Sequence, residues 1–173
     1  MLSEMKSDEF DYVFKIMDES FPNTEMRVYE GQKNLLLEDK YSIIVKRNYS
    51  GDIQGFISCW DLTDFKYIEH FAVDKNQRGN NIGGKMITEF CKSQNRPVVL
   101  EVEFPEDDMS IRRIGFYERN GFLMNEYDYL QPPMRKGNDF LPLKIMSTPR
   151  SITEKEFKTL KDDLYNVVYK YKK

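Results

Sequence analysis

Residues 70–86, HFAVDKNQRGNNIGGKM, decide the fold of this chain. The stretch starts as the end of an apolar strand and passes through a polar, glycine-containing turn into a helical pattern that begins near Asn80. Such a turn gathers free backbone N–H groups at the positive end of a helix dipole, where an anionic phosphate group binds well. Gly79, Gly83 and Gly84 carry no side chain that would block the ligand. We therefore expect a diphosphate-bearing ligand at this turn.

Two other interpretations of the same turn were weighed. The string from Gly79 to Lys85 satisfies G-x-x-x-x-G-K, the pattern of a nucleotide-binding P-loop. Three features argue against a P-loop. Met86 stands where a serine or threonine would contact magnesium, and five residues separate Val73 from Gly79, whereas a P-loop follows its strand closely. No second strand that would supply an acidic magnesium ligand is evident. The other interpretation is that the glycines only make a tight strand-to-helix turn. The surrounding sequence has to decide among the three.

The sequence on either side of the turn predicts a mixed α/β sheet. Before it, apolar and β-branched runs predict three sequential antiparallel strands, with Ser50-Gly51-Asp52 as the first hairpin turn. After it, the helical pattern continues to Asn95-Arg96-Pro97, and a second, short helix closes at Asn120-Gly121. The expected strands are 41–47, 53–62, 65–73, 97–104, 126–131 and 141–147, and the short helix is 110–122.

The two ends of the chain add helices to this sheet. Apolar residues at helical spacing predict a helix over residues 8–20 and a broken helix, weakened by Gly31, over about 24–37. A T-x-x-E capping box at Thr153 and Glu156 predicts a last helix over about 154–171. The segment MLSEMK at the start is short and polar for a strand. We therefore expect the sheet to begin with a frayed or missing edge strand.

Size and composition predict one ordinary globular domain. The 173 residues, 40% of them hydrophobic, suffice to bury one core, so we expect a single domain over residues 1–173. A net charge of −3 without a basic cluster argues against nucleic acid as a partner. Cys59 and Cys91 lack metal-ligand spacing and neighbouring histidines, so no metal is expected. Without a signal peptide or membrane-spanning run, the expected location is cytoplasmic, with no membrane partner.

Two motifs resemble those of the GNAT superfamily of N-acetyltransferases, whose acyl-CoA loop reads R-G-x-G-x-G/A soon after a strand ending in A-V. Here Ala72-Val73 is followed by DKNQ and by RGNNIG at 78–83, with Asn81 in place of the middle glycine. Asparagine suits that place if the backbone there is left-handed. Downstream, SIRRIGFYERNGF is similar to the family's F-Y-x-x-x-G-F segment. Two motifs in the right order at a fitting separation, over roughly residues 40–131, are far more specific than either alone.

This resemblance implies a fold and a function. The fold is a central, mostly antiparallel sheet splayed at its middle and flanked by helices, and the activity is acetyl transfer from the co-substrate acetyl-CoA to an amine. Backbone N–H groups of residues 78–84 would hold the pyrophosphate, residues 71–73 would pair with the pantetheine arm, and Tyr117 would donate a proton to the departing thiolate. Ser110 stands where many members place an asparagine that contacts CoA. The cofactor-binding residues implied are Phe71, Ala72, Val73, Arg78, Gly79, Asn80, Asn81, Ile82, Gly83, Gly84, Ser110 and Tyr117.

The reaction also needs a base, because a lysine-type amine with a pKa near ~10.4 is protonated at neutral pH. Glu101 and Glu103 lie two apart on one strand and face the same way, and Glu69 lies on the neighbouring strand. Glu101 stands in an L-E-V string similar to that of ribosomal-protein alanine acetyltransferases and is preferred as the base, with Glu69 next. Each glutamate can equally be an ordinary outward-facing strand residue. His70 alternates to the face opposite Glu69, has no predicted partner and is assigned no role.

The remaining expectations concern mechanism and partners. Neither cysteine lies in a motif that activates a thiolate, so the amine should attack directly in a ternary complex. A non-catalytic acyl-CoA sensor of the same fold is the alternative, because fold alone does not determine function. Tyr117 together with Glu101 favours catalysis. The sequence does not identify the amine acceptor, and a homodimer is expected only by analogy with the family.

Overall fold

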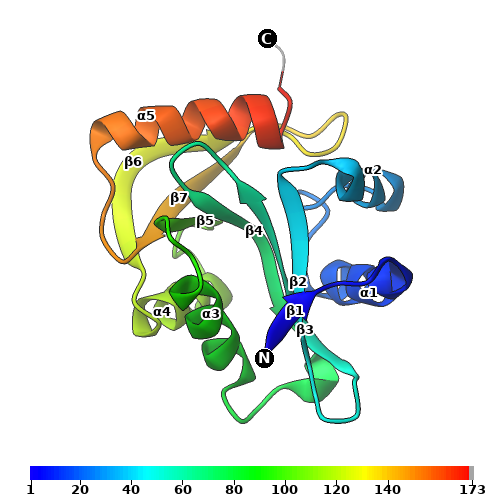
Figure 1. The fold of residues 1–173 in the computed structure, drawn as a ribbon. Helices are drawn as coiled ribbons and strands as arrows, with labels where there is room; N and C mark the ends of the chain where they lie inside the picture. The colour runs from blue at the N-terminus through cyan, green and yellow to red at the C-terminus, as the bar shows by residue number, and fades with distance from the viewer. Residues whose placement is uncertain (172–173) are drawn as a thin grey trace.

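The computed structural model describes residues 1–171, whose strands form one seven-stranded sheet in the order β1-β2-β3-β4-β5-β7-β6 (Figure 1). All neighbouring strands are antiparallel except β4 and β5, which run parallel. The predicted mixed, mostly antiparallel sheet is confirmed. The strands are β1 Leu2–Glu4, β2 Tyr41–Arg47, β3 Ile53–Asp61, β4 Lys66–Val73, β5 Val98–Val102, β6 Leu123–Gln131 and β7 Leu141–Thr148.

Helices cover both faces of the sheet. One apolar cluster joins α1 and α5 to the sheet, and a second joins α3 and α4 to it. Tyr67 belongs to the first cluster and its neighbour Ile68 to the second, and successive strand residues point to opposite faces. The helices are α1 Phe10–Ser20, α2 Tyr29–Asn34, α3 Ile82–Lys92, α4 Asp108–Arg119 and α5 Glu154–Asp163, with 3₁₀ turns at Ser7–Glu9, Leu35–Leu37 and Lys75–Gln77.

The first strand is present, so the expectation of a frayed or missing edge strand is wrong. Residues of β1 pair with Ile44–Lys46 of β2, and the Met5 amide continues the ladder to the Ile43 carbonyl at 2.9 Å. Its polar side chains are compatible with a strand because backbone hydrogen bonds, which do not depend on apolar side chains, hold it in place. The Leu2 amide also donates to Glu89 of α3 at 2.8 Å. A three-residue strand at a sheet edge leaves too weak a sequence pattern to be recognised.

The last helix is shorter than predicted and ends differently. The Thr153 capping box is present, but the α-helix stops at Asp163 and a π-helical turn, Leu164–Val168, follows it. The Tyr169 amide donates to the Leu164 carbonyl at 2.9 Å, which is the wider hydrogen bond of a π turn. Leu164 and Val168 are buried, so packing against the core fixes this turn. As a result Tyr169 lies inside the molecule.

The middle of the sheet is split between β4 and β5. The two strands pair only along Lys66–Ile68 and Val98–Leu100. Farther along, β4 continues with β3 as far as Val73, whereas β5 continues with β7 as far as Val102. The register with β3 shifts where Ser58 faces His70 and Cys59 faces Ile68, which makes Glu69 the extra residue of a β-bulge. The splayed sheet implied by the resemblance is therefore present, with Glu69 at the point of divergence.

Candidate active site

The turn between β4 and α3 is held open by a specific backbone conformation. Asp74 anchors its start by accepting hydrogen bonds from the Tyr12 hydroxyl at 2.5 Å and the Asn76 amide at 2.8 Å. Gly79, Asn80 and Asn81 follow with φ of 110°, 51° and 54°. Asparagine and glycine adopt this left-handed region more readily than other residues do. Asn81 thus has the left-handed backbone expected of it in place of a glycine.

The first turn of α3 fits a diphosphate group. The amides of Gly83 and Gly84 lie in this turn, where an α-helix has no intrahelical acceptors for them. A Cβ at Gly83 would lie 3.5 Å from the Phe116 ring and from Val73, so the missing side chain leaves a space between α3, β4 and α4. A Cβ at Gly84 would lie 2.3 Å from the Asn81 side-chain oxygen. Glycine at 84 therefore accommodates the Asn81 side chain, whereas glycine at 83 opens the site.

The other residues implied to bind the cofactor lie around this turn. Phe71, Ala72 and Val73 hydrogen-bond to β3 along one edge, and their other edge faces the split in the sheet. The Phe71 ring lies 5.9 Å from that of Phe116. Ser110 is buried, and its side chain forms the capping box of α4 with Asp107. A contact between Ser110 and CoA stays a prediction.

A small cavity of about 40 Å³ lies where β4 and β5 diverge. It brings together residues from both strands, from α4 and from the segment before α2. A more open groove of about 620 Å³ runs along α3 from Asn81 to Asn120. We place the chemistry at the smaller cavity, because it combines Tyr117 with several carboxyl groups. Its lining is Phe21, Glu25, Ile68, Glu69, Phe71, Leu100, Glu101, Val102, Glu103, Arg113, Tyr117, Gln131 and Leu143.

Tyr117 is the hydroxyl donor at this cavity. Its ring packs edge-on against Phe116 and Phe122, with ring centroids 5.3 and 5.4 Å away. Burial raises the pKa of Tyr117 to about 12, so the hydroxyl keeps its proton at neutral pH. A tyrosine in this state can donate a proton or a hydrogen bond but cannot act as a base.

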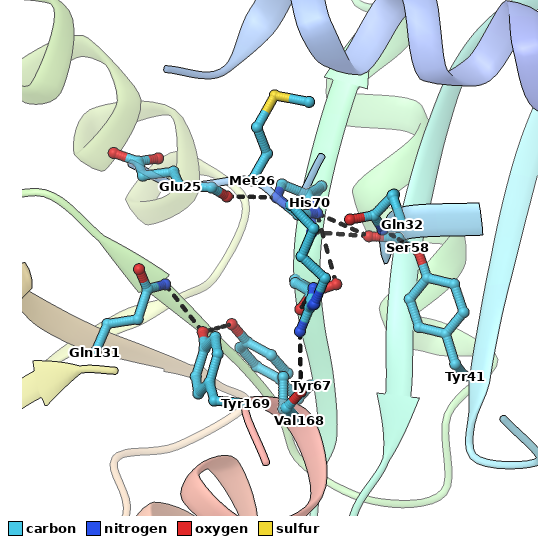
Figure 2. A network of polar contacts seen from close by, with 12 residues as sticks. Glu25, Met26, Gln32, Tyr41, Ser58, Tyr67, His70, Gln131, Val168 and Tyr169 are labelled. Carbon is cyan, nitrogen blue, oxygen red and sulfur yellow. Dashed lines mark hydrogen bonds and ion pairs between the residues drawn. The ribbon is translucent and has the colours of Figure 1, made fainter. Parts of the chain in front are cut away.

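Glu101 is held by a ring of donors from β6 and the C-terminal segment. Tyr129 donates to Oε1 at 2.5 Å, while Gln131 and Tyr169 donate to Oε2 at 2.7 and 2.8 Å. Figure 2 shows Tyr169 between Gln131 and Tyr67, whose hydroxyl lies 2.9 Å from that of Tyr169. Burial raises the pKa of Glu101, and the donors around it oppose that rise. Both oxygens of this carboxyl group are therefore already engaged.

Glu69 has one engaged oxygen and one free one. Arg27 donates to Oε1 at 2.7 Å and, through its other nitrogen, to the Val168 carbonyl at 2.9 Å. Oε2 is buried and has no hydrogen-bond partner within residues 1–171. The nearest ring nitrogen, Nδ1 of His70, lies 3.6 Å away. Glu69 is thus fixed in place by Arg27 while Oε2 keeps its capacity to accept a proton or a hydrogen bond.

His70 does have partners, contrary to the sequence expectation. Its Nε2 lies 2.7 Å from the Glu25 carbonyl, which can only accept, so Nε2 carries the proton (Figure 2). Nδ1 then accepts from the Ser58 hydroxyl at 3.3 Å. Burial lowers the pKa of His70, which keeps the ring neutral and leaves Nδ1 with no proton to give Glu69. The bulge at Glu69 breaks the strict alternation that predicted opposite faces for these two residues.

The sequence and the fold of this chain are both similar to those of known proteins. A family model described as "Acetyltransferase (GNAT) domain" matches residues 38–123. A solved structure from Bacteroides thetaiotaomicron, described as "Putative acetyltransferase from GNAT family", is 32% identical, covers 99% of both chains and superimposes with a TM-score of 0.91. This chain belongs to the GNAT acetyltransferase family. It is therefore an acetyl-CoA-dependent acetyltransferase, and this assignment replaces the P-loop interpretation.

Two further relatives of this GNAT acetyltransferase are more distant. A Bacillus subtilis (strain 168) protein named "Putative acetyltransferase YjbC" is 26% identical over 162 residues, which are 92% of this chain and 82% of that protein. The spermidine N-acetyltransferase of Vibrio cholerae, solved in complex with CoA and spermine, is 11% identical, with a TM-score of 0.62 over 85% of this chain and 93% of that one. That identity shows a shared fold alone.

Several residues of the GNAT site were missed by sequence reasoning. Glu25 and Arg27 lie in a segment predicted only as broken helix, and Tyr169 lies in the range predicted only as the last helix. Their polar groups show that these side chains can form hydrogen bonds. Nothing in the sequence relates them to Glu69 or Glu101, which lie more than forty residues away.

Within the described chain, no helix is long and apolar enough to cross a membrane, and no three His, Cys, Asp or Glu residues group as a metal site.

The Tyr169→Phe variant tests the ring of donors. Burial favours the neutral form of Glu101 in the folded protein, so ionisation of Glu101 as the pH rises costs stability, and the Tyr169 hydroxyl offsets part of that cost. We expect the variant to lose about 1–3 kcal/mol of unfolding free energy at pH 8 and less at pH 4.5. Chemical denaturation at both pH values measures this, with the exposed Tyr49→Phe as the matched control. An equal loss at both pH values would contradict the assignment.

Proposed function

We propose that this GNAT acetyltransferase transfers the acetyl group of acetyl-CoA to an amine by direct attack in a ternary complex. The observation that carries the proposal is the cavity at the split of β4 and β5, because it places a neutral hydroxyl donor beside a buried carboxylate with one free oxygen. Acyl transfer to an amine needs both a proton donor and a proton acceptor. We also propose that residues 1–173 act as a single acyltransferase domain.

Acetyl-CoA supplies the thioester carbon that the amine attacks. In the proposed complex the backbone N–H groups of residues 78–84 hold the pyrophosphate at the start of α3. The free backbone edge of residues 71–73 offers N–H and C=O groups for pairing with the amides of the pantetheine arm, as an added strand would. This course leads from the glycine turn along β4 toward Glu69 and the cavity.

Tyr117 and a carboxylate divide the proton transfers. The amine nitrogen forms a bond to the thioester carbon, the carbon–sulfur bond breaks, and the sulfur receives the proton of the Tyr117 hydroxyl. The proton lost by the amine goes to a carboxylate. Glu69 suits this role because it lines the cavity and its Oε2 has no hydrogen-bond partner in the described chain, whereas both oxygens of Glu101 already accept hydrogen bonds. We therefore propose Glu69 as the base, although the sequence alone favoured Glu101, which would hold the site in shape.

Calorimetry with acetyl-CoA tests the cofactor part of the proposal. We expect the protein to bind acetyl-CoA, and Gly83→Asp to abolish that binding, because a carboxylate there fills the space beside Phe116 and repels the pyrophosphate. Gly31→Asp in α2 is the matched control and should keep the affinity. Equal affinity in the wild type and in Gly83→Asp would remove residue 83 from the binding site.

The Tyr117→Phe variant tests the proton donor. Only one buried hydroxyl is lost, so the fold and the acetyl-CoA affinity should be retained. Transfer to an amine should slow by about 10²- to 10⁴-fold if the hydroxyl protonates the thiolate. Release of CoA thiol in the presence of an amine panel measures the rate. Wild-type turnover in this variant would reject the role of Tyr117.

The base is tested by comparing Glu69→Gln with Glu101→Gln. If Glu69 accepts the proton, its glutamine variant should lose most activity near neutral pH and recover part of it at high pH, where more of the amine is already deprotonated. Glu101→Gln should lower activity without that recovery. The opposite pattern in the pH profiles would exchange the two roles. If neither profile shows recovery, the proton leaves without a single dominant base.

A further inference from the structure

The cavity carries more carboxyl groups than the proposed reaction uses. Four glutamates line it, and two guanidinium groups lie beside them: Arg27 bonds Glu69 at 2.7 Å, and Arg113 lies 4.0 Å from Glu25. Two carboxyl groups are therefore left over in a largely buried site. Buried charges without a partner are unfavourable; donors satisfy both oxygens of Glu101, so Glu103 and its neighbour Glu25 are the carboxyl groups that a cation would stabilise most. The four are Glu25, Glu69, Glu101 and Glu103.

Glu25 and Glu103 line this cavity together, and Glu25 keeps its proton at neutral pH. Burial and then the neighbouring Glu103 carboxyl raise the pKa of Glu25 to about 8. Arg113 on α4 lowers this pKa and Glu101 on β5 raises it, while His70 on β4 contacts only the Glu25 carbonyl and is neutral. At pH 7 Glu25 therefore keeps its proton, and a cation bound between Glu25 and Glu103 would favour its release.

Two unpartnered acceptors point to a ligand that donates hydrogen bonds. Oε2 of Glu69 and Oε1 of Gln131 are buried without a partner in the described chain, and both residues line the cavity. Glu69 has none of its side chain exposed, and Gln131 is 3% exposed. Buried acceptors are nearly always satisfied in folded proteins, by water or by a ligand when not by the protein. An ammonium group, with three donors and a positive charge, matches this pair.

We propose that the acceptor is an amine with a second positive charge, a diamine or polyamine, which binds at two points. The reacting ammonium group meets Glu69 and Gln131 inside the cavity, and the second cationic group lies between the Glu25 and Glu103 carboxyl groups. A volume of about 40 Å³ holds little more than one amine nitrogen. Glu25 and Arg113, with 13% and 29% of their side chains exposed, lie at its rim, where the rest of the acceptor can pass. The inference rests on the proposed amine acetylation.

The proposal predicts that the enzyme prefers acceptor amines with two positive charges to acceptor amines with one. The experiment compares α,ω-diamines from 1,3-diaminopropane to 1,6-diaminohexane with n-alkylamines of the same lengths, in acetyl-CoA-dependent release of CoA thiol at pH 7.5. We expect the best diamine to exceed its matched alkylamine by about tenfold or more in kcat/KM, as expected for one well-placed charge contact. Glu25→Gln and Glu103→Gln should each bring that ratio close to one. Glu106→Gln, an exposed glutamate three residues beyond Glu103, should keep the wild-type ratio.

The pH dependence gives a second readout. Loss of the Glu25 proton above pH 8 leaves a carboxylate that binds a cation more strongly, so the diamine-to-alkylamine ratio of the wild type should rise between pH 7 and pH 8.5. In Glu25→Gln the ratio should stay flat, because no proton remains to be displaced. A ratio that rises equally in this variant would assign the effect to the amines themselves and overturn the role of the pair.

The outcomes separate this inference from the proposed function. If the wild-type enzyme has equal kcat/KM for diamines and alkylamines, the two-point site is overturned while amine acetylation stays intact. This comparison uses the wild type alone, so it does not depend on the folding of any variant. If no amine of either series reacts, acetylation of simple amines is overturned. Calorimetric titration of the acetyl-CoA complex with the diamines then tests the site by itself. Binding that is lost in Glu25→Gln but kept in Glu106→Gln supports the site, and absence of binding to the wild type rejects it.

Discussion

The separation of β4 from β5 is the constraint on which the rest of this structure depends. Two parallel strands that start as hydrogen-bonded neighbours stop pairing after three residues each. The separation leaves strand edges without partners in the middle of a sheet, where unpaired backbone groups are costly. It also creates the two things that a thioester-dependent acyl transfer requires: a backbone edge along which a ligand arm can pair and a cavity at the point of divergence. The bulge at Glu69 lies at that point, so its carboxyl group belongs to the cavity.

A network of buried polar contacts holds the split open. Arg27 links Glu69 to the carbonyl of Val168, and Tyr169 links Glu101 to Gln131 and Tyr67. The π turn at the end of α5 thus supports one carboxylate on each side of the split. Every one of these contacts joins residues far apart in the chain. Buried polar networks of this kind are stable only when most of their members are satisfied, and Glu69 and Gln131 each leave an unsatisfied oxygen in the lining of the cavity.

The glutamates of the site therefore differ in what they can do. Glu101 is immobilised by donors on both oxygens and contributes shape and charge. Glu69 is oriented by one guanidinium group and keeps one oxygen without a hydrogen-bond partner in the described chain. Glu25 keeps its proton at neutral pH and lies near the rim beside Arg113. Chemically identical side chains acquire different roles because their burial and their partners differ.

The sequence by itself determined the order of elements, the glycine turn and the family. The strands from residue 41 onward followed from local patterns, because periodicity, capping and turn preferences act over a few residues. The left-handed backbone at Asn81 and the splayed sheet were implied by the resemblance of two motifs to the GNAT superfamily. Tertiary structure alone decided which carboxylates share the cavity and which of their oxygens remain free. It also decided that Glu25, Arg27 and Tyr169, from opposite ends of the chain, complete the site. Such choices depend on long-range packing and burial, which set the electrostatics of a buried group and leave no local trace in the order of the residues.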